Sequence, residues 1–258
     1  MKTLRGVLDV AYLSALGAVE ATLLCTLFSW GMTALGAVVV FCFRQVKESV
    51  MTLFLGFGAG VMLAASVWSL LLPALEQSSS VLCPALGFAA GGGFILLAEY
   101  WCSYSEIFAE ESSMRRSFLL ILAVTLHNIP EGMAIGVAFG ASSGLGAWLL
   151  ALGIGLQNIP EGAAVSLPLM REGISRGKSF FFGQLSGAVE PVAALVGVLL
   201  ALRLSIVLPF LLAFSAGAMV AVVGGELLPE AASANKNRTI IGFLLGFLLM
   251  MVLDVTLG

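Results

Sequence analysis

A seven-residue motif occurs twice near the middle of this chain, and it places ionisable side chains inside apolar segments. Leu-His-Asn-Ile-Pro-Glu-Gly occupies residues 126–132, and Leu-Gln-Asn-Ile-Pro-Glu-Gly occupies residues 156–162. A carboxylate at the centre of a membrane-spanning helix costs roughly 2.5 to 3.5 kcal/mol on insertion scales, so it normally faces a pathway or a partner. No Lys or Arg lies at the depth of Glu131 or Glu161. A cation is therefore the expected partner.

The composition supports a membrane location for these segments. Of the 258 residues, 60% are hydrophobic and 10% are charged, whereas about 25% are charged in a typical soluble domain. The net charge of −3 and the absence of a basic tract exclude nucleic acid as an expected partner. The four cysteines are widely spaced, with no C-x-x-C pair, and we interpret them as helix-packing residues.

The sequence predicts an all-α integral membrane protein with eight transmembrane helices in the lipid bilayer, because a span needs about 20 apolar residues. Residues 1–20 are predicted to form an N-terminal amphipathic or short membrane element, and residues 21–258 a single transmembrane domain. The predicted spans are 21–43, 50–75, 84–106, 115–141, 144–170, 179–201, 204–228 and 238–257.

The basic residues predict the orientation. Loops after spans 1, 3, 5 and 7 contain Arg44, Lys47, Arg115, Arg116, Arg171, Arg176, Lys178, Lys236 and Arg238, whereas the other side has Lys2, Arg5 and Arg203. Cytoplasmic loops carry the excess of Lys and Arg. We therefore expect both termini on the outer side of the plasma or inner membrane.

The spacing of the motif predicts a shared site. The two copies lie on consecutive, antiparallel spans, with His127 about 12 and Gln157 about 13 residues into their helices, so both fall near the midplane at about 1.5 Å per residue. His127, Asn128 and Glu131 share one helix face, and Gln157, Asn158 and Glu161 repeat that pattern. Two antiparallel copies meeting at one depth are typical of an inverted-repeat transporter.

Prolines and a third carboxylate extend this site. Pro130 and Pro160 have no N–H, so the carbonyls of Leu126 and Leu156 lose their helical partners and must line a cavity or bind something. Glu190 precedes a proline about 11 residues into span 6. The sequence thus predicts a metal site at the midplane between spans 4, 5 and 6.

The donor types narrow the choice of cation. Imidazole, carboxylate and amide ligands without thiolate suit Zn²⁺, Cd²⁺, Fe²⁺ or Mn²⁺ better than Cu⁺. The opposing interpretation is two proline-kinked helices whose polar groups only form hydrogen bonds within the helix bundle.

With these residues, the chain resembles the ZIP (Zrt- and Irt-like) divalent-metal transporters. The resemblance lies in His127 to Gly132, the matching stretch from Gln157, and Glu190. It implies a binuclear centre, with one metal bound by His127, Gln157, Glu131 and Glu161, and a second by Asn128, Asn158, Glu190 and the same two bridging glutamates. It also implies passage of Zn²⁺ or related ions toward the cytoplasm, by an elevator-like movement of one helix bundle against another.

Two features distinguish the chain from many ZIP proteins. Many have His at the position of Gln157, whereas the bacterial GufA-like branch resembles this sequence in having Gln there. The His-rich cytoplasmic loop of eukaryotic relatives is replaced by residues 103–116, with Glu106, Glu110 and Glu111.

Further residues are candidates for the ion's path. Met62 and Met219 could be soft ligands or gap-fillers in the core, and Ser66 and Ser69 could line a path or serve in helix packing. Glu226 is a candidate exit ligand.

Other functions fit the sequence less well. An intramembrane metal-dependent hydrolase would need about three protein ligands and an open position, and no H-E-x-x-H pattern accompanies the single His. A metal-gated channel or sensor is the other alternative. We expect a transporter rather than an enzyme, and a homodimer is compatible with the sequence.

Overall fold

The computed structural model describes residues 17–43, 47–104, 113–141 and 144–257, and these residues form helices without strands. The side chain of His127 lies outside the described part. The same is true of residues 1–16, which make up most of the predicted N-terminal element.

Each predicted span corresponds to a helical rod within the described residues. In chain order the rods are α2 (Ala18–Ala37) with α3 (Val39–Cys42); α4 (Glu48–Ala65) with η1 (Ser66–Leu71) and α5 (Leu72–Gln77); α6 (Leu82–Tyr104); α7 (Ser113–Ala141); α8 (Leu145–Arg171); α9 (Arg176–Leu185) with η3 (Ser186–Ala188) and α10 (Val189–Arg203); and η4 (Ser205–Val207) with α11 (Leu208–Val222) and η5 (Val223–Leu227), leading into α12 (Leu228–Leu257). Non-helical backbone at Asn235, with φ −159° and ψ 96°, divides α12 where the sequence predicts the last turn.

Hydropathy did not predict two details of these rods. The second rod contains the π-helical segment η1, and the seventh contains η5. Such widened turns are uncommon and often accompany functional sites. Their i→i+5 hydrogen bonds leave no mark on an apolar pattern.

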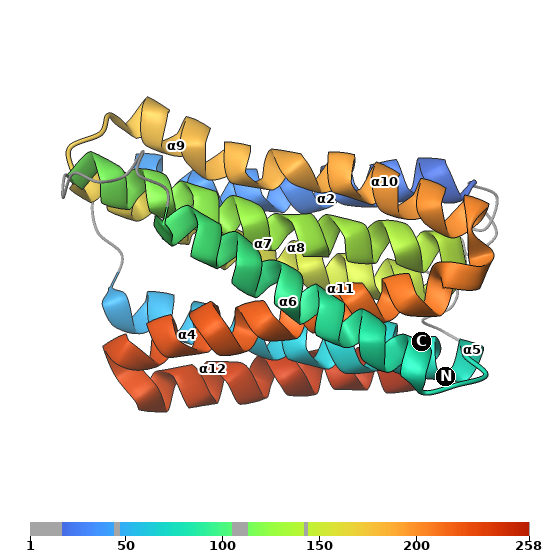
Figure 1. The fold of residues 1–258 in the computed structure, drawn as a ribbon. Coiled ribbons are helices and arrows are strands. Elements are labelled where there is room, and N and C mark those ends of the chain that lie inside the picture. Colours follow the sequence, from blue (N-terminus) through green and yellow to red (C-terminus); the bar gives the residue numbers. More distant parts are fainter. Residues whose placement is uncertain (1–16, 44–46, 105–112, 142–143, 258) are drawn as a thin grey trace, which may run out of the picture.

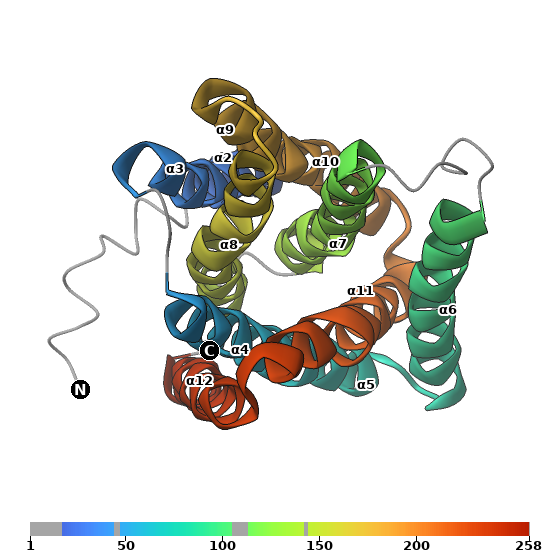
Figure 2. The same ribbon diagram turned by 90° about the vertical axis from the view of Figure 1, so that its left-hand side faces the viewer.

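The rods form two groups, which Figures 1 and 2 show side by side. The motif group consists of α2, α7, α8, α9 and α10, and the flanking group consists of α4, α5, α6, α11 and α12. Within the motif group α2 packs on α8 and α7 on α10, whereas α4 packs on α12 and α6 on α11 in the flanking group. The groups meet mainly where α4 contacts α8 and where α11 contacts α7.

This contact pattern is itself repeated. If spans 1, 2 and 3 are matched with spans 6, 7 and 8, then α2 corresponds to α10, α4 to α11 and α6 to α12, and α7 corresponds to α8. The α2–α8 contact then matches the α10–α7 contact, and the α4–α12 contact matches the α11–α6 contact. The π-helical segment η1 likewise matches η5. Such pairing is what an internal inverted repeat produces.

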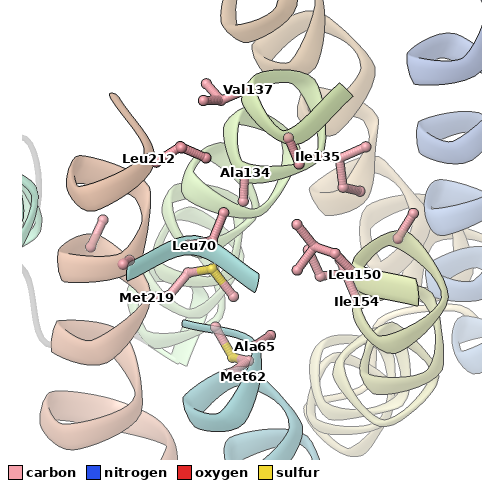
Figure 3. Packing of buried hydrophobic residues seen from close by; sticks show 14 of the residues in the cluster. Met62, Ala65, Leu70, Ala134, Ile135, Val137, Leu150, Ile154, Leu212 and Met219 are labelled. Atoms are coloured by element: carbon pink, nitrogen blue, oxygen red, sulfur yellow. The ribbon is translucent and has the colours of Figure 1, made fainter. Parts of the chain in front are cut away.

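An apolar seam fills the boundary between the two groups. Figure 3 shows buried side chains from α4, η1, α7, α8 and α11 pointing toward one another there. The labelled members are Met62, Ala65, Leu70, Ala134, Ile135, Val137, Leu150, Ile154, Leu212 and Met219.

The outer surface of the bundle is also apolar, as expected of helices that contact lipid. Four described segments are long and apolar enough to cross a membrane: Ala18–Cys42, Glu48–Gln77, Arg176–Arg203 and Leu208–Thr256. Large aliphatic side chains are exposed along α2, α6, α10 and α12, including Leu24, Leu27, Leu86, Leu96, Leu97, Val192, Val196, Leu244 and Leu248. Surfaces of this kind would aggregate in water. The protein is therefore suited to a bilayer.

Candidate metal centre

The glycine that ends each copy of the motif brings two backbones into contact. A Cβ added to Gly132 would lie 2.8 Å from the Cα of Glu190, and one added to Gly162 would lie 2.9 Å from the carbonyl carbon of Thr33. Neither position has room for a larger residue. Gly132 therefore fixes α7 against α10 beside Glu190, and Gly162 fixes α8 against α2.

A hydrogen bond joins the two copies of the motif. The Nε2 atom of Gln157 on α8 donates to Oε1 of Glu131 on α7 at 2.7 Å. Glu131 also interacts electrostatically with Glu161 and Glu190. The carboxylates expected at one site thus influence one another across three helices.

The two motif asparagines are held by neighbouring helices. Nδ2 of Asn158 donates to Oε1 of Glu190 at 2.8 Å and to the Ser29 hydroxyl at 2.9 Å. Nδ2 of Asn128 donates to the carbonyl oxygen of Ser186 at 2.9 Å. In both amides the nitrogen faces a protein acceptor, so the oxygen is left for another partner.

The site is enclosed and rich in oxygen atoms. Asn128, Glu131, Gln157, Asn158 and Glu190 are 0% exposed. Each has a buried oxygen that accepts no hydrogen bond in the described part of the chain: Asn128 Oδ1, Glu131 Oε2, Gln157 Oε1, Asn158 Oδ1 and Glu190 Oε2. Buried polar atoms are costly without a partner. A hard or borderline cation is a partner that carboxylate and amide oxygens accept together.

Carboxylates alone do not complete the site. Within the described residues, no group of three or more His, Cys, Asp or Glu side chains is arranged to hold a metal. The His127 side chain is outside that search, although its backbone lies in α7 one turn before Glu131. Glu161 is also buried, on the same helix as Gln157. The amide oxygens are therefore needed in any coordination shell built from the described side chains.

The motif prolines do not interrupt their helices. α7 is helical through Pro130 and α8 through Pro160. Since proline has no N–H, the carbonyls of Leu126 and Leu156 still lack their usual donors. Each lies one residue before the polar pair of its motif.

Met62 and Met219 lie together in the apolar seam (Figure 3), and both are fully buried. Met62 is one turn beyond Gly58, whose added Cβ would lie 3.5 Å from Cβ of Gln157. The two sulfur atoms are therefore in the layer adjacent to the motif. Ser66 is buried as well, and its hydroxyl donates to the carbonyl of Met62 at 2.7 Å.

A cavity opens at the end of the bundle where α5 ends and α8 begins. Its volume is about 360 Å³, and its lining includes Ser69, Gln77, Gly146 and Asp254. The Ser69 hydroxyl lies 2.9 and 3.0 Å from the two carboxylate oxygens of Asp254. We call this the α5-end cavity. Of the predicted path residues, the structure places Ser69 here.

A smaller cavity lies toward the opposite end, where α4 begins and α8 ends. It has a volume of about 170 Å³ and is lined by Glu48, Thr52, Pro168, Glu230 and Ala234, among others. We call this the α4-start cavity. Glu226 is half-buried in η5 and is not among the lining residues described for this cavity.

Two polar residues near the site or path were not predicted. Ser29 contacts Asn158 from α2, and Asp254 joins Ser69 from the end of α12. An acidic residue inside the last apolar segment was a signal for Asp254. Ser29 belongs to a series of buried hydroxyl residues, Thr22, Thr26, Ser29 and Thr33, and nothing in their spacing distinguishes it.

Comparisons with known proteins identify the family of this chain. A family model described as "ZIP Zinc transporter" matches residues 104–254. A protein named zinc transporter ZIP11 from Xenopus tropicalis is 38% identical, with 92% of this chain and 97% of the relative covered. Zinc transporter GufA from Myxococcus xanthus is 34% identical, with 92% and 99% covered. Zinc transporter ZIPB from Bordetella bronchiseptica is 35% identical, with 88% and 78% covered.

The family matched is one of membrane transporters rather than enzymes. Its model covers more than half of the chain, and the relatives match along nearly all of it. This chain belongs to the ZIP zinc transporter family and is an integral membrane protein.

Proposed function

We propose that this protein carries Zn²⁺, and with it Cd²⁺, Fe²⁺ or Mn²⁺, through the plasma or inner membrane toward the cytoplasm. The observation that carries this proposal is the set of buried amide and carboxylate oxygens on α7, α8 and α10 that accept no hydrogen bond from the described side chains or backbone. The names of the relatives support zinc as the principal substrate.

The binding site that we propose is binuclear. One cation is held by His127, Gln157, Glu131 and Glu161. The second is held by Asn128, Asn158, Glu190 and the two bridging glutamates. The Gln157–Glu131 and Asn158–Glu190 hydrogen bonds support this division, because each joins two members of one proposed shell.

The proposed path runs between the two cavities. A cation enters at the α5-end cavity beside Ser69 and Asp254, passes Ser66, Met62 and Met219, and reaches the motif. It leaves through the α4-start cavity, with Glu226 as an exit ligand. The apolar seam closes the bundle next to Met62 and Met219, so a carrier is favoured over an open channel.

An elevator-like movement would open this closed seam. We propose that the motif group slides against the flanking group, with eight membrane spans, both termini outside and the site near the midplane. The division of contacts into two groups supports this movement, since α7 and α8, which bear the motif, pack mainly on α10 and α2 of their own group.

Metal flux into liposomes tests the proposed function. Purified protein is reconstituted into vesicles loaded with a metal-sensitive dye, and Zn²⁺, Cd²⁺, Fe²⁺, Mn²⁺ and Ca²⁺ are added in turn. We expect saturable uptake of Zn²⁺ by the wild type and its loss in His127→Ala/Glu131→Ala, because this double variant removes an imidazole and a bridging carboxylate.

Two controls make the result decisive. Thr26→Val alters a buried hydroxyl that bonds only within α2 and should transport normally. Uptake in the double variant equal to that of the wild type would contradict the site. Metal binding without transport by the wild type would instead favour a sensor.

A further inference from the structure

The α2 helix contributes one side chain to the candidate metal centre, the hydroxyl of Ser29. This residue is 0% exposed, within a helix that packs along α8. Its Oγ lies 2.9 Å from Nδ2 of Asn158, and its hydroxyl is also hydrogen-bonded to the carboxylate of Glu190. Ser29 thus connects two residues of the proposed second metal shell.

In the described part of the chain, the other buried hydroxyl residues of α2 hydrogen-bond within their own helix. Thr22, Thr26 and Thr33 donate to carbonyl oxygens one turn earlier in the same helix, at 2.7, 2.8 and 3.4 Å. Bonding of this kind only satisfies the hydroxyl itself. Ser29 differs because its partners are side chains of α8 and α10.

The directions of these hydrogen bonds follow from the groups involved. A carboxylate that binds a metal is ionised and only accepts hydrogen bonds, so in that state the Ser29 hydroxyl donates its proton to Glu190 and accepts from Asn158. The Asn158 atom that faces both neighbours must then be nitrogen, and its oxygen must point elsewhere. That oxygen is buried and accepts no hydrogen bond in the described part of the chain.

We propose that Ser29 is a positioning residue of the metal centre, which holds the Asn158 amide with Oδ1 directed to the cation and keeps Glu190 Oε2 free to bind. Ser29 acts through these two side chains and is not itself a ligand. This role rests on the proposed function, since it presupposes that Asn158 and Glu190 bind the transported ion.

The other asparagine of the motif shows why Ser29 is needed on α2. Asn128 is held by the backbone carbonyl of Ser186, which no side-chain substitution removes. Asn158 also donates to the corresponding backbone carbonyl of Ser29, but at 3.4 Å, whereas its contact with the Ser29 hydroxyl is 2.9 Å. The shorter contacts of Asn158 are therefore with side chains, whereas that of Asn128 is with backbone.

The magnitude of the effect can be anticipated. Groups that orient metal ligands typically change metal affinity by about 10- to 100-fold when removed. Ser29→Ala should therefore weaken Zn²⁺ and Cd²⁺ binding by about that factor and raise the KM of uptake more than it lowers the maximal rate. Ser29→Thr, which keeps the hydroxyl, should recover most of the affinity.

The experiment compares the full-length wild type, Ser29→Ala, Ser29→Thr and Thr26→Val. Equilibrium binding of Zn²⁺ and Cd²⁺ to the purified proteins is measured alongside flux and thermal stability. Thr26→Val is the matched control, because Thr26 is equally buried on α2 and bonds only to its own helix. We expect its affinity and flux to equal those of the wild type.

The outcomes separate this proposal from the proposed function. If Ser29→Ala binds metal as tightly as Thr26→Val, the positioning role is wrong, whereas flux lost in Glu131→Ala would leave the transport function intact. An equal loss in Ser29→Ala and Thr26→Val would assign the effect to helix packing and overturn the role. A wild type that neither binds nor transports Zn²⁺ would overturn both proposals.

Discussion

At the scale of single residues, the centre pairs each of two carboxylates with an amide N–H. Gln157 donates to Glu131 and Asn158 donates to Glu190. A neutral donor of this kind partly satisfies a buried carboxylate, and a divalent cation satisfies it far better. A cation at the proposed site would share each carboxylate with its amide donor, because Oε2 of Glu131 and of Glu190 accepts no hydrogen bond in the described part of the chain.

Gln157 offers the sharpest test of selectivity. An imidazole nitrogen binds Zn²⁺ better than an amide oxygen does, whereas oxygen ligands suit Mn²⁺. Gln157→His should therefore raise the preference for Zn²⁺ over Mn²⁺ and Fe²⁺. The measurement is inhibition of Zn²⁺ uptake by Mn²⁺ and Fe²⁺ in the wild type and in Gln157→His. Identical inhibition curves would show that Gln157 does not determine metal selectivity.

The sequence predicts the residues that lie within a regular pattern and misses those that do not. Asn128, Glu131, Gln157 and Asn158 belong to a repeated motif on helices whose period is known. In the structure all four are buried, and Gln157 hydrogen-bonds to Glu131 across the two helices. Glu190 was found through its proline neighbour. Ser29 was missed because it lies about 130 residues from Asn158 in the chain, and only tertiary packing relates them.

At the scale of helices, close packing depends on glycines at particular positions. α6 packs chiefly on α11, at the edge of the flanking group (Figure 2). A Cβ added to Gly91 would lie 2.9 Å from the backbone nitrogen of Ala218 on α11, whereas one added to Gly93 would meet nothing within 4 Å. Gly93 therefore has room for a larger side chain, whereas Gly91 on the same helix does not.

These two glycines give a matched pair of variants. Gly91→Ala should lower stability by about 1–3 kcal/mol, because the helices must separate to admit the methyl group. Gly93→Ala should be neutral or stabilise the helix, since alanine has the higher helix propensity. Thermal unfolding in detergent compares them, and equal melting temperatures would contradict the tight contact between α6 and α11.

Hydropathy predicted where the helices lie, but it did not predict the π-helical segments within them. Every predicted span is helical in the described residues, since a run of about 20 apolar residues has few other solutions in a bilayer. The π-helical segments η1 and η5 are defined by which backbone carbonyl accepts the hydrogen bond of each N–H. An apolar pattern contains no information on that choice.

At the scale of the whole molecule, we expect the α5-end cavity and the α4-start cavity to open on opposite sides of the membrane. Gln77 lines the α5-end cavity and Ala234 the α4-start cavity, and both are exposed. If the α5 end faces outward, a membrane-impermeant thiol reagent added outside intact cells should label Gln77→Cys and spare Ala234→Cys, in a protein whose four native cysteines are replaced.

Membrane permeabilisation provides the control for this experiment. Ala234→Cys should become labelled once the reagent can enter, which shows that the thiol is reactive. Labelling of Ala234→Cys in intact cells, with protection of Gln77→Cys, would reverse the orientation and place both termini in the cytoplasm.

The glycine contacts and the apolar seam differ in how easily they would deform. At Gly132 and Gly162 backbone touches backbone, so no side chain separates α7 from α10 or α8 from α2 at these positions. The seam contains aliphatic, aromatic and thioether side chains in the described residues, so its contacts are mainly non-directional. In the proposed elevator-like movement, resistance to sliding along the seam would limit turnover, while the close backbone contacts would preserve the geometry of the site.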